Sequence, residues 1–269
     1  SFNQQMQQFN DWAEFLADHA SDADYRKSTD PDEAPRHYID IDNYDVFLST
    51  GRIPQTLDSV IMLYGNYFVY EQGVLPWATL RTYDSLLNSF EEGRWEDALL
   101  FASDLGHYVA DGHMPLHLTL NYNGQFSNNL GIHSRYESTM INAYISQISY
   151  SGSPFSEIDD VRQYIFDYIY QNYHYMDSVL MADDYAKSVS GGSTSSSAYK
   201  QALWEFSSGF TTVMFENASH SLAALIYTAW AQAGSPQMPS SDVHENQLSR
   251  GFNLEQNVPN PFSGSTTIS

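Results

Sequence analysis

Apolar residues recur every three or four positions through most of the first 232 residues, the spacing that places side chains on one face of an α-helix. The opening segment, residues 1–20, shows the pattern in Phe2, Met6, Phe9, Trp12, Ala13, Leu16 and Ala20. The same periodicity predicts helices over 59–72, 76–92, 94–112, 133–149, 157–181 and 196–232. Alternating strand patterns are scarce, so we predict an all-α fold, a compact multi-helix bundle of roughly seven to nine helices.

Polar stretches separate these helices. Residues 21–60 contain several prolines and many aspartates, which favours an irregular segment with short turns. Residues 113–131 are rich in asparagine and glycine and are predicted to form a loop. Two further linkers are "SGSPFS" and the low-complexity "SVSGGSTSSS".

The helical pattern stops after Ala233. We therefore divide the chain into a helical domain over residues 1–232, a polar linker over 233–251 and a tail over 252–269. The tail, "FNLEQNVPNPFSGSTTIS", resembles the start of the C-terminal sorting tail used by type IX secretion in some Gram-negative bacteria, which opens Leu-x-Gln-Asn-x-Pro-Asn-Pro-Phe. The resemblance implies a secretion machinery as partner and a secreted or cell-surface location. Such tails run further, so we expect the chain to stop inside one.

Composition narrows the chemistry. The chain has no cysteine, so any metal must be held by His, Asp and Glu. Its formal net charge of −22 argues against broad binding to a phosphate backbone, although bound cations can outweigh that field inside a pocket. No apolar run reaches the length of about 18 residues that a membrane span needs, and we expect no integral membrane segment.

Histidines and acids gather in "GHYVADGHMPLH", from Gly106 to His117. His107 and Asp111 are four apart on a predicted helix, so both side chains face one side and can bind one ion. A single such pair is commonly a surface ion pair. The spacing is repeated by His133 and Glu137 at the start of the next predicted helix, and His117 lies between the two pairs. This repetition favours a metal site.

The upstream loop supplies further ligand types. His37 lies there in a polar setting, where burial in an apolar core is a poor explanation for it, and Asp22 and Asp24 precede it. Loop-borne His and Asp are suited to completing a site whose rigid half is helical. His113 fits neither pair and is interpreted as a neighbour of the ligands or a surface residue.

The runs "HYVADGHMPLH" and "GIHSRYE" resemble the bacterial zinc-dependent phospholipases C and their relatives, the fungal single-strand-specific (S1/P1-type) nucleases. That family combines an all-helical fold with a three-zinc cluster. Its motifs are a helical His-x-x-x-Asp, then Pro-Leu-His or similar, then Gly-x-His-x-x-x-Glu in the phospholipases or His-x-x-x-Asp in the nucleases. The resemblance spans about residues 1–232.

The resemblance implies a ligand set. The second zinc would be held by His117, His133 and Glu137, with a position left open for water or phosphate. The first zinc would be held by Asp22, His37, His107 and Asp111, and Asp111 would also bridge toward a third zinc. Asp22 is preferred to Asp24 because the family ligand tends to be the first aspartate of Asp-x-Asp, and it would also act catalytically by orienting or deprotonating the attacking water.

The third zinc of the family is bound by an N-terminal tryptophan and by a histidine about ten residues later. This chain begins with Ser1, and His19 lies too near Asp22 to substitute. We therefore expect two to three zinc ions, and we expect the native N-terminus to be missing from this chain.

The implied activity is hydrolysis of a phosphodiester, because zinc lowers the pKa of bound water toward about 7. Glu137 favours a phospholipase C-like enzyme. Ala23 and Ala34, however, stand where the phospholipases carry aromatic residues around choline, so a choline cage would need Tyr25, Tyr38 or Tyr122 instead. A single-strand-type nuclease is the alternative, and a secreted metal-binding module without turnover is a third possibility.

Overall fold

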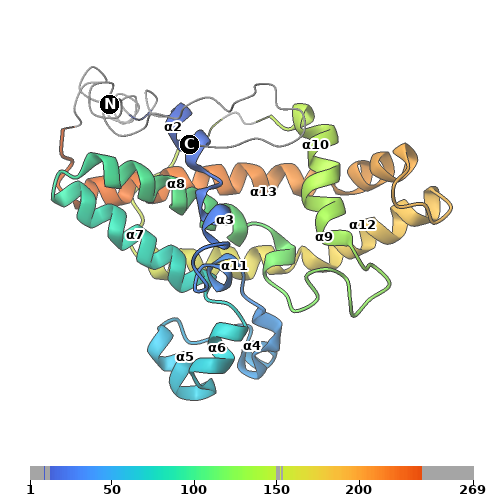
Figure 1. Cartoon of the computed structure of the whole chain (residues 1–269), viewed down its shortest axis with the longest axis horizontal. Coiled ribbons are helices and arrows are strands. Elements are labelled where there is room, and N and C mark those ends of the chain that lie inside the picture. The colour runs from blue at the N-terminus through green and yellow to red at the C-terminus, as the bar shows by residue number, and fades with distance from the viewer. Residues whose placement is uncertain (1–8, 10–12, 150–151, 153, 238–269) are drawn as a thin grey trace, which may run out of the picture. The chain divides into compact units, whose positions relative to one another are not determined.

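The computed structural model describes residue 9, residues 13–149, residue 152 and residues 154–237. Within these residues the chain forms helices joined by turns, with no strand, which confirms the all-α prediction (Figure 1). Trp12–Pro236 forms one compact unit. The second unit, residues 1–11 with 237–269, falls almost entirely outside the described residues, as do the predicted sorting tail and most of the predicted linker. No described helix has the length and apolarity needed to span a membrane.

The first third of the unit is built from short helices. They are α2 (Ala13–His19), α3 (Asp22–Arg26), the 3₁₀ turns η2 (Ala34–His37) and η3 (Ile41–Asn43), α4 (Asp45–Thr50), α5 (Leu57–Tyr64) and α6 (Asn66–Glu71). The prediction of an irregular segment over 21–60 missed α4, whose six residues are too few to show a helical period. The single helix predicted over 59–72 is wrong, because Gly65 adopts a φ of +83° and divides α5 from α6.

Longer helices form the body of the unit. α7 (Leu75–Glu91) and α8 (Trp95–Gly112) match their predicted ranges closely and pack extensively on each other. The long helix α13 (Ser197–Gln232, orange in Figure 1) contacts both of them and packs along α12 (Met176–Val189).

The helix predicted over 157–181 is instead two helices, α11 (Val161–Tyr173) and α12. Asp160 caps α11 by accepting a hydrogen bond from the backbone of Gln163, which sets its start.

The segment predicted as one helix over 133–149 has an irregular winding. It begins as α9 (Ile132–Ser134), widens into a π-helical turn η5 (Arg135–Met140), and returns to α10 (Ile141–Tyr144) and the 3₁₀ turn η6 (Ile145–Gln147). The predicted loop over 113–131 contains one short 3₁₀ turn, η4 (Pro115–His117). Widened turns of this kind occur often at functional sites, and this one carries Glu137.

Two apolar clusters make up the core, and the histidines lie where the clusters meet. Leu116 belongs to one cluster and Leu118 to the other, and both are fully buried, so His117 is held between them. Each buried leucine contributes roughly 2 kcal/mol. Tyr108 beside His107 and Ile132 beside His133 are buried in the same way. Core packing therefore fixes the backbone of these histidines.

The segment that carries His37 is held on two sides by backbone hydrogen bonds. On one side, the amides of Val74 and Leu75 donate to the carbonyls of Pro35 and Tyr38. On the other side, the amide of Ile39 donates to the carbonyl of His117 at 2.8 Å. Gly73, with a φ of +81°, allows the close approach, because a Cβ there would lie 2.1 Å from the carbonyl oxygen of Tyr38.

We predict that Gly73→Ala lowers the free energy of unfolding by about 3 kcal/mol or more, because it adds both backbone strain and a clash with main chain. Gly93→Ala is the matched control. Gly93 also has a positive φ, of +68°, but a Cβ there meets nothing within 4 Å, so its cost should be about 1 kcal/mol. Denaturant unfolding of both variants checks this, and equal costs would contradict the assigned role of the close approach.

Candidate metal centre

The structure brings Asp24, His37 and His107 together as one group of metal-ligand type. His37 Nδ1 lies 3.0 Å from His107 Nε2. Asp24 Oδ1 lies 3.7 Å from the first of these nitrogens and 3.6 Å from the second. The aspartate comes from α3, His37 from η2 and His107 from α8, so three separate elements converge on one point.

The other nitrogen of each ring is directed at an acceptor. His107 Nδ1 lies 2.7 Å from the carbonyl oxygen of Ala20, to which it donates. His37 Nε2 is buried, has no hydrogen-bond partner and lies 3.3 Å from Glu33 Oε1. His107 Nε2, Asp111 Oδ2 and Asp24 Oδ1 therefore all approach His37 Nδ1, at 3.0, 3.0 and 3.7 Å. A cluster of acceptor-type atoms of this kind is stabilised by a shared proton or by a bound cation.

Asp111 joins this first group and connects it to the second. Its Oδ2 lies 3.0 Å from His37 Nδ1 and 3.4 Å from His107 Nε2. Its Oδ1 lies 2.9 Å from His117 Nδ1. Burial by itself would raise the pKa of Asp111, but the charges and hydrogen bonds of the surrounding histidines, His117 foremost, hold that pKa well below its usual range. The carboxylate is therefore ionised and shared between the two groups.

His117, His133 and Glu137 form the second group. The Nε2 atoms of the two histidines lie 3.2 Å apart, and Glu137 Oε2 lies 2.9 Å from His133 Nε2. His117 Nδ1 is 3.1 Å from the carbonyl oxygen of His37, and His133 Nδ1 is 3.2 Å from that of Tyr122. The Nδ1 atoms thus face oxygen acceptors, Asp111 and the carbonyl of His37 for His117 and the carbonyl of Tyr122 for His133, and the two Nε2 atoms point at each other.

The charges around the second group call for a cation. Burial alone would lower the pKa of His117, yet Asp111 and Glu137 together raise it to about 10. Burial alone would likewise raise the pKa of Glu137, but hydrogen bonds and charge from His117 and His133 lower it to about 2. Without a metal ion, a proton on His117 therefore supplies the positive charge that the site demands.

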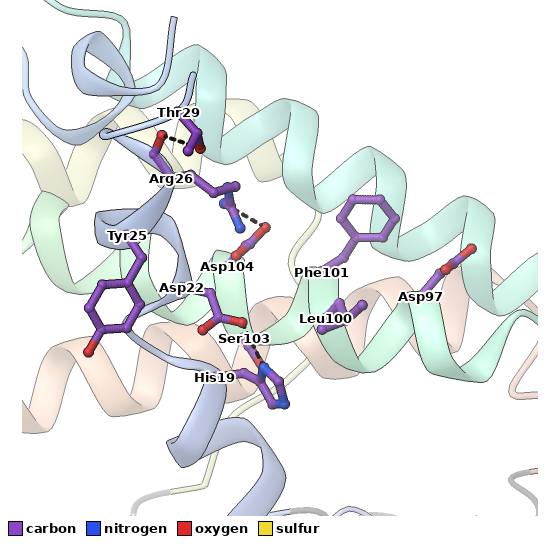
Figure 2. Close-up of a pocket in the computed structure, with 10 residues that line it drawn as sticks. All are labelled: His19, Asp22, Tyr25, Arg26, Thr29, Asp97, Leu100, Phe101, Ser103 and Asp104. Atoms are coloured by element: carbon purple, nitrogen blue, oxygen red, sulfur yellow. Dashed lines mark hydrogen bonds and ion pairs between the residues drawn. The ribbon is translucent and has the colours of Figure 1, made fainter. Parts of the chain in front are cut away.

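Asp22, predicted as a ligand and as a catalytic residue, lies elsewhere. Its Oδ2 is 2.6 Å from His19 Nδ1, in a separate cavity of about 640 Å³ that is also lined by Ser103 and Asp104 (Figure 2). The structure therefore groups Asp24, and not Asp22, with His37 and His107. The two aspartates are two residues apart on α3, so they project about 200° apart and only one of them can face His37.

Two buried carboxylates that sequence reasoning missed support the groups from behind. Glu33, fully buried, accepts hydrogen bonds from Arg36 at 2.6 Å and from Tyr108, and it faces His37. Its spacing of four residues before His37 was an available signal. Asp183, also fully buried, accepts from Arg135 at 2.8 Å and so holds the turn between His133 and Glu137. No local pattern marks that second contact, which spans 48 residues.

Two cavities flank the paired groups, and His117 and His133 line both. The first, about 380 Å³, has an apolar wall that includes Met114, Ile141, Met214 and Phe215. The second, about 410 Å³, is lined by Tyr38, Asp40 and Tyr122. His113 lines the first cavity and is buried, with Nδ1 bonded to the carbonyl of Val109 and its ring stacked on Tyr168, so its interpretation as a surface residue is wrong.

The donors fit a divalent metal ion. Each group offers two imidazole nitrogens and at least one carboxylate, a set that suits zinc and similar ions, and the side of each group that faces a cavity is open to a further ligand. Comparison with known proteins adds no assignment: no protein-family model matches this sequence, and neither does any curated protein.

We predict that Asp24→Asn removes one metal site and that Asp22→Asn does not. After incubation with zinc and desalting, Asp24→Asn should hold about one ion fewer per chain than the wild type, because an amide is a poor ligand for a dication. Asp22→Asn, which touches only the His19 cavity, should match the wild type. The opposite ranking by elemental analysis would restore Asp22 as the ligand.

We also predict that zinc displaces a proton from His117. Because the pKa of His117 is about 10 in the metal-free fold, the ring is protonated at pH 7.5 and must lose that proton to bind through Nε2. Calorimetric titration in buffers of different ionisation enthalpy should show about one proton more released by the wild type than by His117→Gln. Proton release should decline as the pH approaches about 10. Equal release by the two proteins would contradict the assignment.

Proposed function

We propose that this protein is a zinc-dependent phosphodiester hydrolase of the phospholipase C-like type, with the two sites described above. The observation that carries the proposal is the convergence of imidazole nitrogens and carboxylate oxygens in two groups, with ring nitrogens 3.0 Å apart in the first group and 3.2 Å apart in the second. Its further support is the order and spacing of ligands from His107 to Glu137, which resembles the zinc-dependent phospholipase C and S1/P1-type nuclease family. The specific fold type of that family is part of the proposal.

The residues have distinct roles in this proposal. Bound zinc lowers the pKa of a water ligand to about 7 and neutralises charge on phosphoryl oxygens. Asp24, whose side chain is 52% exposed, is the carboxylate placed to accept a proton from a water that enters from the cavity. Asp111 is buried and holds His37 and His117 in orientation. Glu137 contacts Nε2 of His133 and holds that ring in the lining of the cavity that would receive the substrate.

A phospholipid is the favoured substrate because an apolar wall and an aromatic pocket lie on either side of the metal groups. The aromatic side chains that could contact a cationic head group are Tyr38 and Tyr122. Tyr25 lines the separate His19 cavity and is excluded from that role. Single-stranded nucleic acid is the alternative substrate, since the same two tyrosines could stack on a base. Export through the tail over 252–269 remains part of the proposal.

The activity test is a comparison of zinc-loaded protein on phosphatidylcholine, single-stranded DNA and a chromogenic phosphodiester. We expect hydrolysis of the chromogenic ester and of phosphatidylcholine, both abolished by a chelator and restored by zinc. Faster cleavage of DNA would select the nuclease alternative. Stoichiometric zinc without turnover of any of the three would instead indicate a metal-binding module.

Asp111→Asn tests the shared carboxylate. A neutral amide of nearly equal volume should lower the hydrolysis rate by about 100-fold or more, because the first group loses a charged ligand and His117 loses its partner. Zinc should be lost mainly from the first group, since His117, His133 and Glu137 remain. Elemental analysis with rate measurements checks this, and a variant with full zinc content and normal rate would show that Asp111 has no part in the site.

A further inference from the structure

Lys27 stands out because it is the one lysine or arginine among the described residues that line the two cavities beside the metal groups. It follows directly after α3 and is the C-cap residue of that helix. It lines both cavities, a property shared only with His117 and His133. A ligand that reaches from one cavity into the other therefore passes this ammonium group as well as the second metal group.

The ammonium is tied to the first group. Lys27 Nζ donates to Asp24 Oδ1 at 2.6 Å, and that same oxygen is the one that faces His37 and His107. The contact holds a flexible side chain beside the ligands, and Lys27 is exposed, so the ammonium has further donors available for an incoming anion. Its position results from the three-residue spacing from Asp24 on α3.

Charge counting shows why a cation is needed here. Two zinc ions would bring four positive charges and the ligand carboxylates of Asp24, Asp111 and Glu137 three negative ones, leaving about one positive charge. Asp40 in the second cavity, whose pKa burial raises to about 7, lowers that remainder further when it is ionised. Attack of hydroxide on a phosphodiester monoanion produces a transition state with about two negative charges. The charge of Lys27 raises the total to about two. On a chain with a formal charge of −22, this balance has to be local.

We propose that Lys27 is a phosphate-binding residue whose ammonium contacts a phosphoryl oxygen of the substrate at the junction of the two cavities. The inference rests on the proposed zinc hydrolase function and extends it to a residue outside the ligand set. It assigns the junction to an anionic phosphoryl group, with the remainder of the substrate extending into the cavities on either side.

The test uses zinc-loaded full chain and inorganic phosphate as the probe, with binding measured by calorimetry at an ionic strength near 0.15 M. Lys27→Gln should raise the dissociation constant for phosphate about tenfold or more, and Lys27→Arg should stay within about threefold of the wild type. Arg94→Gln is the control. It removes the same charge from an exposed ion pair with Glu92 and Asp97, remote from the cavities, and should leave phosphate binding unchanged.

Two further readouts separate binding from positioning. Zinc content of Lys27→Gln should equal that of the wild type, and its kcat/KM on a phosphodiester should fall more than its phosphate affinity, because charge builds up in the transition state. Equal phosphate binding by Lys27→Gln and Arg94→Gln overturns the inference. Loss of zinc from Lys27→Gln also overturns it, since Lys27 would then only position Asp24. A wild-type chain that holds no zinc overturns the proposed function itself, and this inference with it.

Discussion

The convergence of imidazole nitrogens and carboxylate oxygens in two adjoining groups is the constraint on which the rest of the site depends. In each group two ring nitrogens lie within 3.2 Å of each other and one of them within 3.0 Å of a carboxylate oxygen, so a proton or a metal ion has to lie between these acceptor-type atoms. The raised pKa of His117 shows the protein's response when only protons are available. A site of this kind favours a bound positive charge, and one dication can coordinate both rings of a group at once.

The fold maintains this arrangement by fixing the backbone on either side of each histidine. His117 lies between Leu116 and Leu118, which are buried in different apolar clusters, so a shift of its backbone away from the site would expose a leucine. Glu33 and Asp183 act behind the ligands, where each is buried and pairs with arginine. Removing either carboxylate would leave a guanidinium without its buried partner, a change that commonly costs about 3–5 kcal/mol.

The sequence was most informative where a contact is local. The His-x-x-x-acid spacing predicted the pairing of His107 with Asp111 and of His133 with Glu137, because a helix converts a spacing of four into proximity. The helices over 76–92, 94–112 and 196–232 were predicted for the same reason. Local spacing could not rank Asp22 against Asp24, since the choice depends on which face of a five-residue helix meets η2 and α8.

Contacts between distant segments were beyond the sequence pattern. The backbone hydrogen bonds that hold the His37 segment join residues 35–39 to residues 74–75 and 117. The close approach that they require depends on the positive φ of Gly73. Asp183 meets Arg135 across 48 residues. The ion pair between Lys27 and Asp24 is local, but its importance comes from the two cavities that both include Lys27 in their lining.

The most direct measurement is anomalous X-ray diffraction from crystals of the zinc-loaded protein, collected on both sides of the zinc absorption edge. We expect two strong anomalous peaks, one between His37 Nδ1 and His107 Nε2 with Asp24 in contact, and one between His117 Nε2 and His133 Nε2 with Glu137 in contact. Absence of both peaks when zinc is present in excess, or peaks only at surface carboxylates, would contradict this assignment of the metal ligands.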